Sequence, residues 1–325
     1  MALLSVSNLS VEYWTNHASY LKAVDGVSFQ VEEGEVIGLA GESGCGKSTL
    51  AHSILRILPR SARVTGSIMV NGSDVMKMDE RSARNYRWKQ VSLVPQASMN
   101  AFDPVIPVGA QIVESIRIHD STPKPAAWKR TRELFALVGI SEKRVREYPH
   151  QFSGGMKQRA AIAMALSLEP KLVILDEPTT ALDVIVQKQI LNLLKRLQKE
   201  LGITILFVTH DLSVLSDIAT RIAVMYAGKI AEIGPSSEFF KSPKHPYGRA
   251  LIQAIPTLRG DLSSVKGIQG APPNLLSPPS GCRFHPRCPF VFDRCKKEEP
   301  ELLNVEGNAM VACHLFDVGG GHVES

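Results

Sequence analysis

Apolar residues in the first 235 positions come in short blocks, whose spacing alternates between that of strands and that of helices. Blocks at strand spacing fill residues 3–40, and the continuous apolar run at 36–40 predicts a central parallel strand. Similar runs follow at 91–94, 171–175, 203–209 and 222–226. Apolar residues three and four positions apart predict helices at 50–58 and 190–201. Between about 97 and 168, helical spacing replaces strand spacing. The pattern therefore predicts an α/β domain with an inserted helical subdomain.

The regular spacing fades beyond residue 235, where prolines become frequent. Residues 267–281 hold four prolines among glycines and serines, which is typical of a linker or an irregular loop. Four of the five cysteines crowd into the stretch that follows. We therefore expect an α/β domain at 1–235, with its helical insert at about 97–168, and a small irregular, cysteine-rich domain within residues 236–325.

Composition narrows the functional classes only a little. The 325 residues are 44% hydrophobic and 21% charged, as in a soluble globular protein. The net charge of +5 is mild and only 6% of residues are aromatic, so nothing indicates a nucleic-acid partner. No apolar run approaches the roughly 18 to 20 residues that span a bilayer, and the first ten residues do not resemble a secretory signal. We expect the chain in the cytoplasm, acting on any membrane from its surface.

Residues 41–49, GESGCGKST, match the phosphate-binding pattern G-x-x-x-x-G-K-[ST] between a predicted strand and a predicted helix. Glycines at this spacing let backbone N–H groups turn toward phosphate oxygens, and the helix dipole adds positive potential. We expect Lys47 to reach the β- and γ-phosphates and Ser48 to ligate Mg²⁺. The remaining residues expected to hold the nucleotide are Ser43, Gly44, Cys45, Gly46 and Thr49. Cys45 is interpreted as a small tolerated residue rather than a redox switch.

Two carboxylates stand directly after the apolar run at 172–175. Asp176, at the end of the predicted strand, is placed to hold Mg²⁺ directly or through water. Glu177 would then point toward the γ-phosphate and polarise the attacking water as a general base. Two acids after a strand are weak evidence alone, but the phosphate-binding loop in the same chain makes this interpretation the better one.

Residues 153–159, SGGMKQR, resemble the signature motif of ABC-transporter ATPases, with Phe152 and Met156 in place of the usual leucine and glutamine. The resemblance extends over residues 1 to about 235. It implies a nucleotide-binding domain with a P-loop ATPase core, an antiparallel β subdomain and the helical insert. It also implies that the chain is an enzyme, an ATPase that converts ATP and water to ADP and phosphate.

The other family elements follow in order. The resemblance implies that Gln96 is the Q-loop glutamine, which also ligates Mg²⁺, and that residues 181–183 form the D-loop, ending in Asp183. It implies that His210 is the switch histidine, which acts with Lys47 on the transferring phosphoryl group. Tyr13 stands where the adenine-stacking aromatic residue is expected, and Tyr20 is the alternative.

Ser153, Gly154 and Gly155 open a predicted helix, so they offer a second set of N–H groups to an anion. Since the chain already has one phosphate-binding loop, this second site suggests completion in trans. In the family, two subunits form a head-to-tail dimer, in which the Ser153 loop of one subunit closes over ATP bound at Lys47 of the other. The partner is expected to be a copy of the chain or a paralogue.

Residues 148–155, 244–247 and 281–289 resemble dipeptide and oligopeptide importer ATPases. The resemblance implies a peripheral protein at the cytoplasmic face of the cell membrane, acting with two transmembrane permease subunits and, indirectly, a substrate-binding protein. Two alternatives stay open: a nickel importer ATPase, and a soluble ABC ATPase acting on nucleic acid or ribosomes. The second is less favoured because the chain has one cassette and no long coiled-coil insert.

Cys282, Cys288, Cys295 and Cys313 are separated by five, six and seventeen intervening residues. Four thiolates suit Zn²⁺ or an iron–sulfur cluster. Because no tight C-x₂₋₄-C pair occurs, and because of the resemblance to peptide-importer ATPases, a [4Fe–4S] cluster is favoured over zinc, and over free or disulfide-bonded thiols. We expect the cluster to be structural and remote from the nucleotide, with His285 and His314 as non-ligands.

Overall fold

The computed structural model describes residues 2–15, 19–96, 101–255 and 267–317. The strands of the larger sheet are β3 (Val36–Ala40), β6 (Val91–Val94), β7 (Leu172–Asp176), β8 (Thr204–Thr209), β9 (Arg221–Tyr226), β10 (Lys229–Pro235), β11 (Leu303–Val305) and β12 (Ala309–Val311). Those of the smaller sheet are β1 (Ala2–Trp14), β2 (Tyr20–Glu32), β4 (Ala62–Val70) and β5 (Ser73–Asp74). The α-helices are α1 (Lys47–Leu55), α2 (Glu80–Lys89), α3 (Val108–His119), α4 (Lys124–Leu137), α5 (Gly154–Ala165), α6 (Val184–Leu201), α7 (Leu212–Ile218), α8 (Ser236–Lys241), α9 (Pro246–Gln253) and α10 (Asp293–Lys297).

The larger sheet runs in the order β11-β12-β10-β9-β3-β8-β7-β6. The strands from β9 to β6 pair in parallel, and β3, β7 and β8 are buried along their whole length, as their apolar runs predict. Because parallel strands end at the same edge, the loops after β3, β7 and β8 meet there. Because β7 pairs with β8, the strand before His210 lies beside the strand before Glu177.

Two hydrophobic cores lie on opposite faces of the larger sheet, and strand alternation assigns residues to them. In β3, Val36 and Ala40 belong to the core shared with the helical insert. Ile37 and Leu39 belong to the core shared with α1 and the smaller sheet. A strand with both faces covered needs an apolar residue at every position, which is why this segment has no polar alternation.

The smaller sheet is antiparallel, in the order β2-β1-β4-β5, and confirms the expected β subdomain. In the second half of β2, Val27, Phe29 and Val31 are buried while the intervening residues are exposed. One face therefore covers the core and the other faces solvent.

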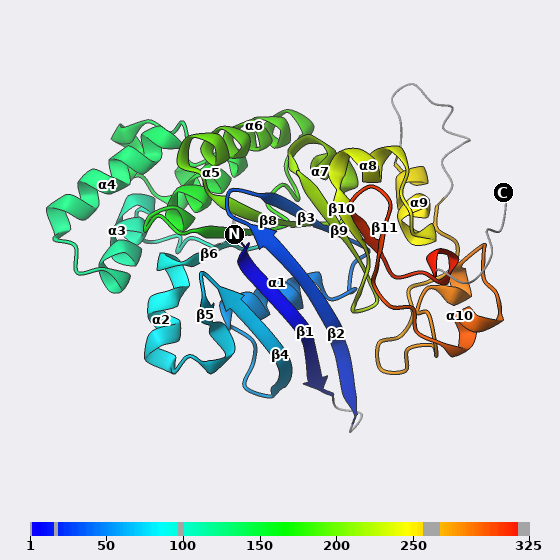
Figure 1. Ribbon diagram of the computed structural model, residues 1–325. Helices are drawn as coiled ribbons and strands as arrows, with labels where there is room; N and C mark the ends of the chain where they lie inside the picture. The colour runs from blue at the N-terminus through cyan, green and yellow to red at the C-terminus, as the bar shows by residue number, and fades with distance from the viewer. Residues whose placement is uncertain (1, 16–18, 97–100, 256–266, 318–325) are drawn as a thin grey trace.

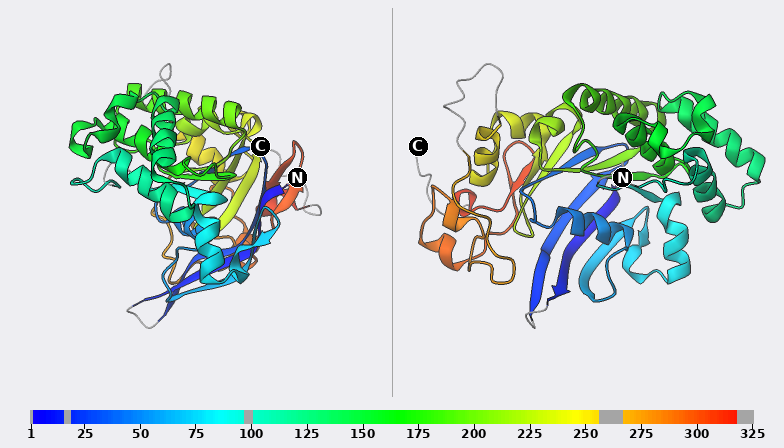
Figure 2. Two further views of the ribbon diagram at one scale, coloured as in Figure 1. Left: turned by 90° about the vertical axis from the view of Figure 1, so that its left-hand side faces the viewer. Right: turned by 180° about the vertical axis from the view of Figure 1, so that it is seen from behind.

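The helical insert consists of α3, α4, two 3₁₀ turns (Glu142–Arg146 and Pro149–Gln151) and α5. It lies at one end of the molecule, and the C-terminal segment lies at the opposite end (Figures 1 and 2). The first four positions of the expected insert, 97–100, lie outside the described residues. The insert is as helical as its spacing predicts.

The C-terminal segment, which we call the extension (described at residues 236–255 and 267–317), is joined to the main sheet. β12 pairs antiparallel with β10, Glu232 opposite Val311, and β11 extends the edge beyond it. Residues 282–300 form short turns and α10 below this edge (Figure 1). The domain boundary at 235 and a separate cysteine-rich domain stay predictions. Backbone pairing between β10 and β12 crosses this proposed boundary. In the described part of the chain, no helix combines the length and apolar character needed to cross a bilayer.

Candidate functional site

The phosphate-binding loop connects β3 to α1, and its glycines are required for two different reasons. Gly41 and Gly46 adopt φ values of 150° and 105°, and a Cβ atom on either would lie 2.1 Å from a neighbouring carbonyl oxygen, of Met225 or Ala23. Gly44 also has a positive φ, of 77°, but nothing lies within 4 Å of its Cβ position. At Gly41 and Gly46 a neighbouring carbonyl oxygen leaves no room for a side chain. At Gly44 only the positive φ favours glycine.

Lys47, the first residue of α1, has a buried side chain whose ammonium group lies across the loop. Its Nζ donates to the carbonyl oxygens of Gly41 and Glu42, at 2.8 and 2.9 Å, and lies 3.7 Å from the Cys45 Sγ. Burial raises the pKa of the Cys45 thiol, despite the ammonium beside it. The thiol is therefore neutral at physiological pH, which fits a packing role better than a reactive one.

Ser48 and Asp176 come together as expected. The Ser48 hydroxyl donates to Asp176 Oδ1 at 3.3 Å, so the end of β7 meets the start of α1. Burial raises the pKa of Asp176, and the Ser48 hydrogen bond only partly opposes this. A buried carboxylate and a hydroxyl are hard oxygen donors of the kind that Mg²⁺ prefers, and a cation there would offset the desolvation of the carboxylate.

Glu177 gathers the polar groups of three loops. Its Oε1 lies 2.9 Å from His210 Nδ1, and its Oε2 accepts from Gln96 Nε2 at 3.0 Å and from Thr180 Oγ1 at 3.1 Å. Burial alone would raise the pKa of Glu177, but the hydrogen bonds and charges of His210, Thr180 and Lys47 outweigh it and lower the pKa. The carboxylate is therefore ionised at neutral pH and held in a fixed orientation.

Thr180 is missing from the residues predicted by sequence. It lies three positions after Glu177 and its hydroxyl returns to that carboxylate, as side chains in tight turns commonly do. The run of two threonines after the acidic pair was a local signal that could have indicated it.

Tyr13 lies beside the loop, whereas the Tyr20 ring has other partners. The Tyr13 hydroxyl lies 3.4 Å from Thr49 Oγ1, on α1. The guanidinium of Arg63 lies 3.8 Å from the centroid of the Tyr20 ring, and the Trp14 ring packs edge-on at 4.8 Å. The geometry therefore favours Tyr13 over Tyr20 as the residue next to a nucleotide.

Ser153 and Asp183 cap neighbouring helices rather than meeting the phosphate-binding loop. The Ser153 side chain accepts from Met156 N at the start of α5, and that of Asp183 accepts from Val186 N at the start of α6. A Cβ on Gly155 would lie 2.6 Å from Val186, so the two helix starts are packed together. Within the described residues, no hydrogen bond or ion pair joins Ser153, Gly154 or Gly155 to residues 41–49.

The four C-terminal cysteines line one small pocket, together with Phe284, Phe290 and three histidines, His245, His285 and His314. All four are free thiols, and burial raises the pKa of Cys288, of Cys282 to about 11 and of Cys313 to about 12. No group of three or more His, Cys, Asp or Glu residues in the described ranges has an arrangement suited to a metal ion. In the described residues the four thiols thus lie around one pocket, but they are not arranged as metal ligands.

His285 and His314, the two histidines close to the cysteines in sequence, also contact other groups. His285 Nδ1 lies 3.0 Å from the Cys282 carbonyl oxygen. Both ring nitrogens of His314 are engaged, one with Asp317 and one with the Glu298 carbonyl. That neither histidine is a ligand stays a prediction.

Two contacts between the extension and the loop were not predicted. Tyr247, on α9, and Arg287, which directly precedes Cys288, both bind Glu42 inside the phosphate-binding loop. The sequence predicts a cysteine site remote from the nucleotide, but a side chain next to one of these cysteines reaches the loop itself. Neither residue belongs to a nucleotide-binding motif. The only signal in the sequence is that each lies in a segment resembling peptide-importer ATPases, 244–247 for Tyr247 and 281–289 for Arg287.

Comparison with known proteins identifies the family. The chain is 42% identical to the dipeptide transport ATP-binding protein DppD of Bacillus subtilis, over 98% of this chain and 96% of that protein. It is 40% identical to DppD of Escherichia coli, over 98% and 99%, and 41% identical to the oligopeptide transport ATP-binding protein OppD of Bacillus subtilis, over 99% and 91%. The chain belongs to the ABC transporter family.

Two sequence models agree with this assignment. The ABC transporter model matches residues 24–180, and the model of the oligopeptide/dipeptide transporter C-terminal region matches residues 231–295. This ABC protein also resembles a dimeric ATP-binding cassette bound to ADP and phosphate, with a TM-score of 0.63 and 25% identity over 72% of this chain and 98% of the other. A second solved relative, cbiO1 from Clostridium perfringens, gives a TM-score of 0.64 and 29% identity, over 74% and 91%. The predicted ABC ATPase fold is confirmed, and the chain is an ABC-type ATPase.

The glycines of the loop give a matched pair of substitutions. Gly46→Ala places a Cβ 2.1 Å from the Ala23 carbonyl, so we expect loss of nucleotide binding and a lower urea midpoint of unfolding. Gly44→Ala meets only backbone strain, of about 1 to 2 kcal/mol, and should be the milder variant. Equal effects of the two substitutions on binding and unfolding would contradict the close-approach argument.

Proposed function

We propose that this ABC ATPase is the ATP-hydrolysing subunit of an importer for dipeptides and oligopeptides. The observation that carries the proposal is full-length similarity to transport proteins named for these substrates, reaching through the C-terminal segment as well as the cassette. The relatives compared above are named for peptides, which favours peptide import over nickel import. Their transport names also favour an importer over a soluble ATPase acting on nucleic acid.

The roles proposed for the phosphate-binding loop follow from its geometry. Lys47 binds the β- and γ-phosphates with the ammonium group that now contacts two loop carbonyls, and stabilises the transferring phosphoryl group. The N–H groups of the loop and of the α1 start cradle the phosphates. The loop residues proposed to hold the nucleotide are Ser43, Gly44, Cys45, Gly46, Ser48 and Thr49. Tyr13 is proposed to stack on adenine.

Magnesium is implied by the family, and the residues present fit it. Ser48 and Asp176 would hold the cation together with Gln96, whose amide nitrogen is bonded to Glu177 and whose amide oxygen is the atom able to ligate. When bound, the cation would supply charge neutralisation at the phosphates.

Glu177 is proposed to orient and deprotonate the attacking water. Its lowered pKa keeps it ionised, and the contacts with Gln96, Thr180 and His210 fix where it points. A base that is held in place needs no reorganisation when the proton moves. His210, half exposed, is close enough to Glu177 to act at the same γ-phosphate.

The Ser153, Gly154 and Gly155 site is proposed to act on ATP bound by a second ATPase subunit, a copy of the chain or a paralogue. Val184 and Ile185, beside the capping residue Asp183, are 80% and 73% exposed, which suits a protein interface better than a solvated helix start. The start of α5 adds its dipole to that face.

Two transmembrane permease subunits are the further proposed partners, with a substrate-binding protein acting through them. In the helical insert Val105 is 76% exposed, and Ile118 borders a hollow of about 530 Å³ between α3 and α4. Large apolar side chains exposed in the insert, together with a hollow lined by apolar and charged residues, suit a segment of another protein. The proposed location is therefore the cytoplasmic face of the membrane, as a peripheral protein.

A [4Fe–4S] cluster is proposed at the four cysteines, with zinc as the alternative. The support is that the four thiols, of which those of Cys295 and Cys313 are buried, line one pocket. A cubane binds its four thiolates on four separate iron atoms, so they lie farther apart than around one zinc. When bound, the cluster would stabilise the fold of the extension.

Glu177→Gln tests the proposed base. The amide keeps the size and most hydrogen bonds of the side chain but cannot accept the proton. ATP turnover should therefore fall by about 10² to 10⁴-fold while ATP binding is retained. Turnover is measured as phosphate release, and dimerisation by sedimentation in the presence of ATP. Thr180→Val, which removes one hydrogen bond to the same carboxylate, should lose much less; near-normal turnover in Glu177→Gln would refute the assignment.

The transported solute is tested in the membrane complex. The chain, co-expressed with its permease subunits and reconstituted in lipid vesicles with the binding protein, should hydrolyse ATP faster when dipeptides or short oligopeptides are added. Nickel chloride is the matched addition and should have no effect. Stimulation by nickel alone, or co-purification of the chain with RNA in place of permeases, would overturn the peptide-importer proposal.

The cysteine proposal predicts a brown protein after anaerobic purification, with about four irons per chain. Replacing Cys288 and Cys295 together with Ser should remove the iron and expose residues beyond about 280 to protease, because ligation supplies folding energy there. Replacing Cys45 with Ser is the control and should leave the iron in place. One zinc per chain in colourless protein would favour zinc, and a metal-free, protease-resistant extension would exclude both.

A further inference from the structure

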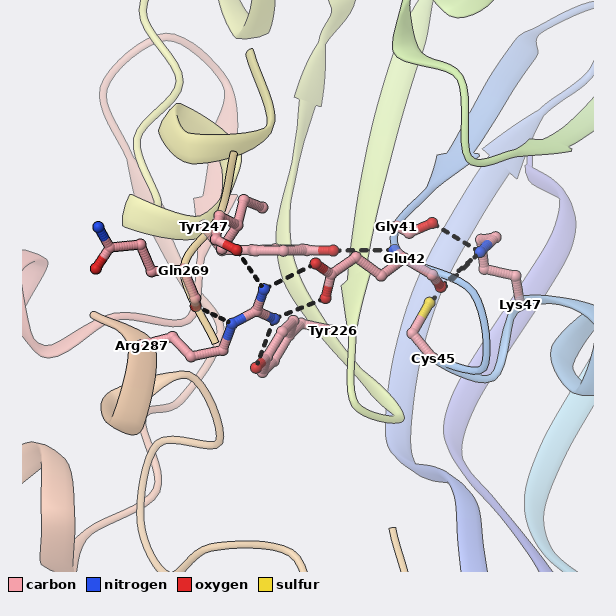
Figure 3. Close-up of polar contacts among 9 residues, drawn as sticks. Gly41, Glu42, Cys45, Lys47, Tyr226, Tyr247, Gln269 and Arg287 are labelled. Carbon is pink, nitrogen blue, oxygen red and sulfur yellow. Dashed lines mark hydrogen bonds and ion pairs between the residues drawn. The ribbon is translucent and has the colours of Figure 1, made fainter. Parts of the chain in front are cut away.

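Glu42, the second residue of the phosphate-binding loop, has every polar group engaged. Its N–H donates to the Tyr247 hydroxyl at 3.0 Å, and its carbonyl oxygen accepts from Lys47 Nζ at 2.9 Å. Its carboxylate accepts two parallel bonds from Arg287, with Nη1 2.7 Å from Oε2 and Nη2 2.9 Å from Oε1 (Figure 3). The Cys45 N–H also donates to the Glu42 carbonyl oxygen, at 3.3 Å. Two of the four partners, Tyr247 and Arg287, belong to the extension.

Arg287 is itself rigidly held. Its side chain is 5% exposed, and Nε donates to the Gln269 carbonyl at 2.9 Å. Nη1 also donates to the Tyr226 hydroxyl at 3.3 Å, so the guanidinium contacts β9 as well as the loop (Figure 3). An exposed ion pair contributes little because solvent screens it and both side chains must be ordered. The Arg287–Glu42 pair is bidentate, sheltered from solvent and ordered on both sides. Screening and side-chain ordering therefore weaken it little.

The charge of Glu42 explains why such a partner is needed. A loop that binds a polyphosphate gains from positive potential, and a free carboxylate within it would repel the ligand. Screening at physiological ionic strength acts over about 8 Å, so it cannot hide a charge carried by the loop itself. Arg287 cancels that charge, and its fork holds the carboxylate on the side of the loop that faces the extension.

The contacts also orient the loop backbone. With the Glu42 N–H turned toward Tyr247, its peptide unit is fixed at the point where the chain leaves β3. Lys47 bonds the carbonyl of the same residue. A change at Arg287 or Tyr247 would therefore alter both the charge and the shape of the loop that receives the nucleotide.

We propose that Arg287, assisted by Tyr247, is a positioning residue for nucleotide binding: it neutralises Glu42 and holds the phosphate-binding loop in its receptive conformation. The extension then contributes directly to the ATP site of its own chain. Both residues lie within 231–295, the region matched by the transporter C-terminal model, and outside the cassette match at 24–180. The inference rests on the proposed role of residues 41–49 as the phosphate site.

Arg294 provides a matched control. It precedes Cys295 as Arg287 precedes Cys288, and it also forms ion pairs within the extension, with Glu298 and Asp317. Its side chain is 47% exposed, and neither Glu298 nor Asp317 belongs to the phosphate-binding loop. A substitution at Arg294 therefore removes an arginine beside a cysteine without touching Glu42.

The experiment compares Arg287→Gln, Glu42→Gln, the double variant and Arg294→Gln in the full-length protein. Arg287→Gln should raise the Kd for a non-hydrolysable ATP analogue about tenfold, or about 1.4 kcal/mol, measured by calorimetry. The kcat at saturating ATP should change less than about threefold, because the interaction acts on binding. Adding Glu42→Gln to Arg287→Gln should restore affinity, since the uncompensated charge is removed. Arg294→Gln should bind like the unaltered chain.

The proposal is overturned if Arg287→Gln binds the analogue normally, or if the double variant binds no better than Arg287→Gln. A loss in kcat with unchanged Kd would also overturn it. If Arg287→Gln does not fold, Arg287→Lys replaces it: the charge is kept and the fork is lost, so an intermediate loss of affinity is expected. Lys47→Ala distinguishes failure of the proposed phosphate site from failure of the proposed role of Arg287. Normal analogue binding by Lys47→Ala would refute the phosphate site itself, whereas weak binding there with normal binding by Arg287→Gln refutes only this inference.

Discussion

The backbone of the phosphate-binding loop lies so close to its neighbours that the rest of the site must be built around it. Gly41 faces the Met225 carbonyl on β9, and Gly46 faces the Ala23 carbonyl on β2. The loop is thus wedged between the two sheets. Gly228 N, in the β9–β10 turn, donates to the Cys45 carbonyl at 2.9 Å and holds the loop against the same strands. This fit determines where the N–H groups of the loop can point.

The parallel sheet then brings the other chemical groups to that edge. Asp176, Glu177 and His210 follow two paired strands, although 33 positions separate Glu177 from His210. Their environments differ in a useful way. Burial raises the pKa of Asp176, while hydrogen bonds and charges lower that of Glu177. Adjacent carboxylates therefore suit two tasks, one as a cation ligand and one as an ionised base.

Sequence reasoning found what is encoded locally. The phosphate-binding pattern, the buried strands and the acids at strand ends each depend on a few neighbouring residues, and the structure places them as expected. β4 was not predicted, since most of its residues are partly or fully exposed and Gly66 interrupts it, so no apolar run marks it. The sequence favours Tyr13 over Tyr20 as the adenine-stacking residue, and only the structure shows that the Tyr13 hydroxyl lies beside Thr49 on α1.

The extension was the part least accessible from sequence. Arg287 and Glu42 are 245 positions apart, and a single long-range ion pair leaves no periodic pattern in either segment. The strand β12 is three residues long and is defined by its pairing with β10 rather than by its own composition. The spacing of the four cysteines predicted a shared metal site, but not that the residue beside one of them would reach the phosphate-binding loop.

The most direct test of the account is the structure of the Glu177→Gln protein with Mg²⁺ and ATP. The account predicts that the Lys47 ammonium leaves the Gly41 and Glu42 carbonyls and binds the phosphates, while Glu42 keeps its contacts with Arg287 and Tyr247. It also predicts that the γ-phosphate is covered by Ser153 of a second ATPase subunit. ATP bound away from residues 41–49, or covered by Ser153 of the same chain, would contradict it.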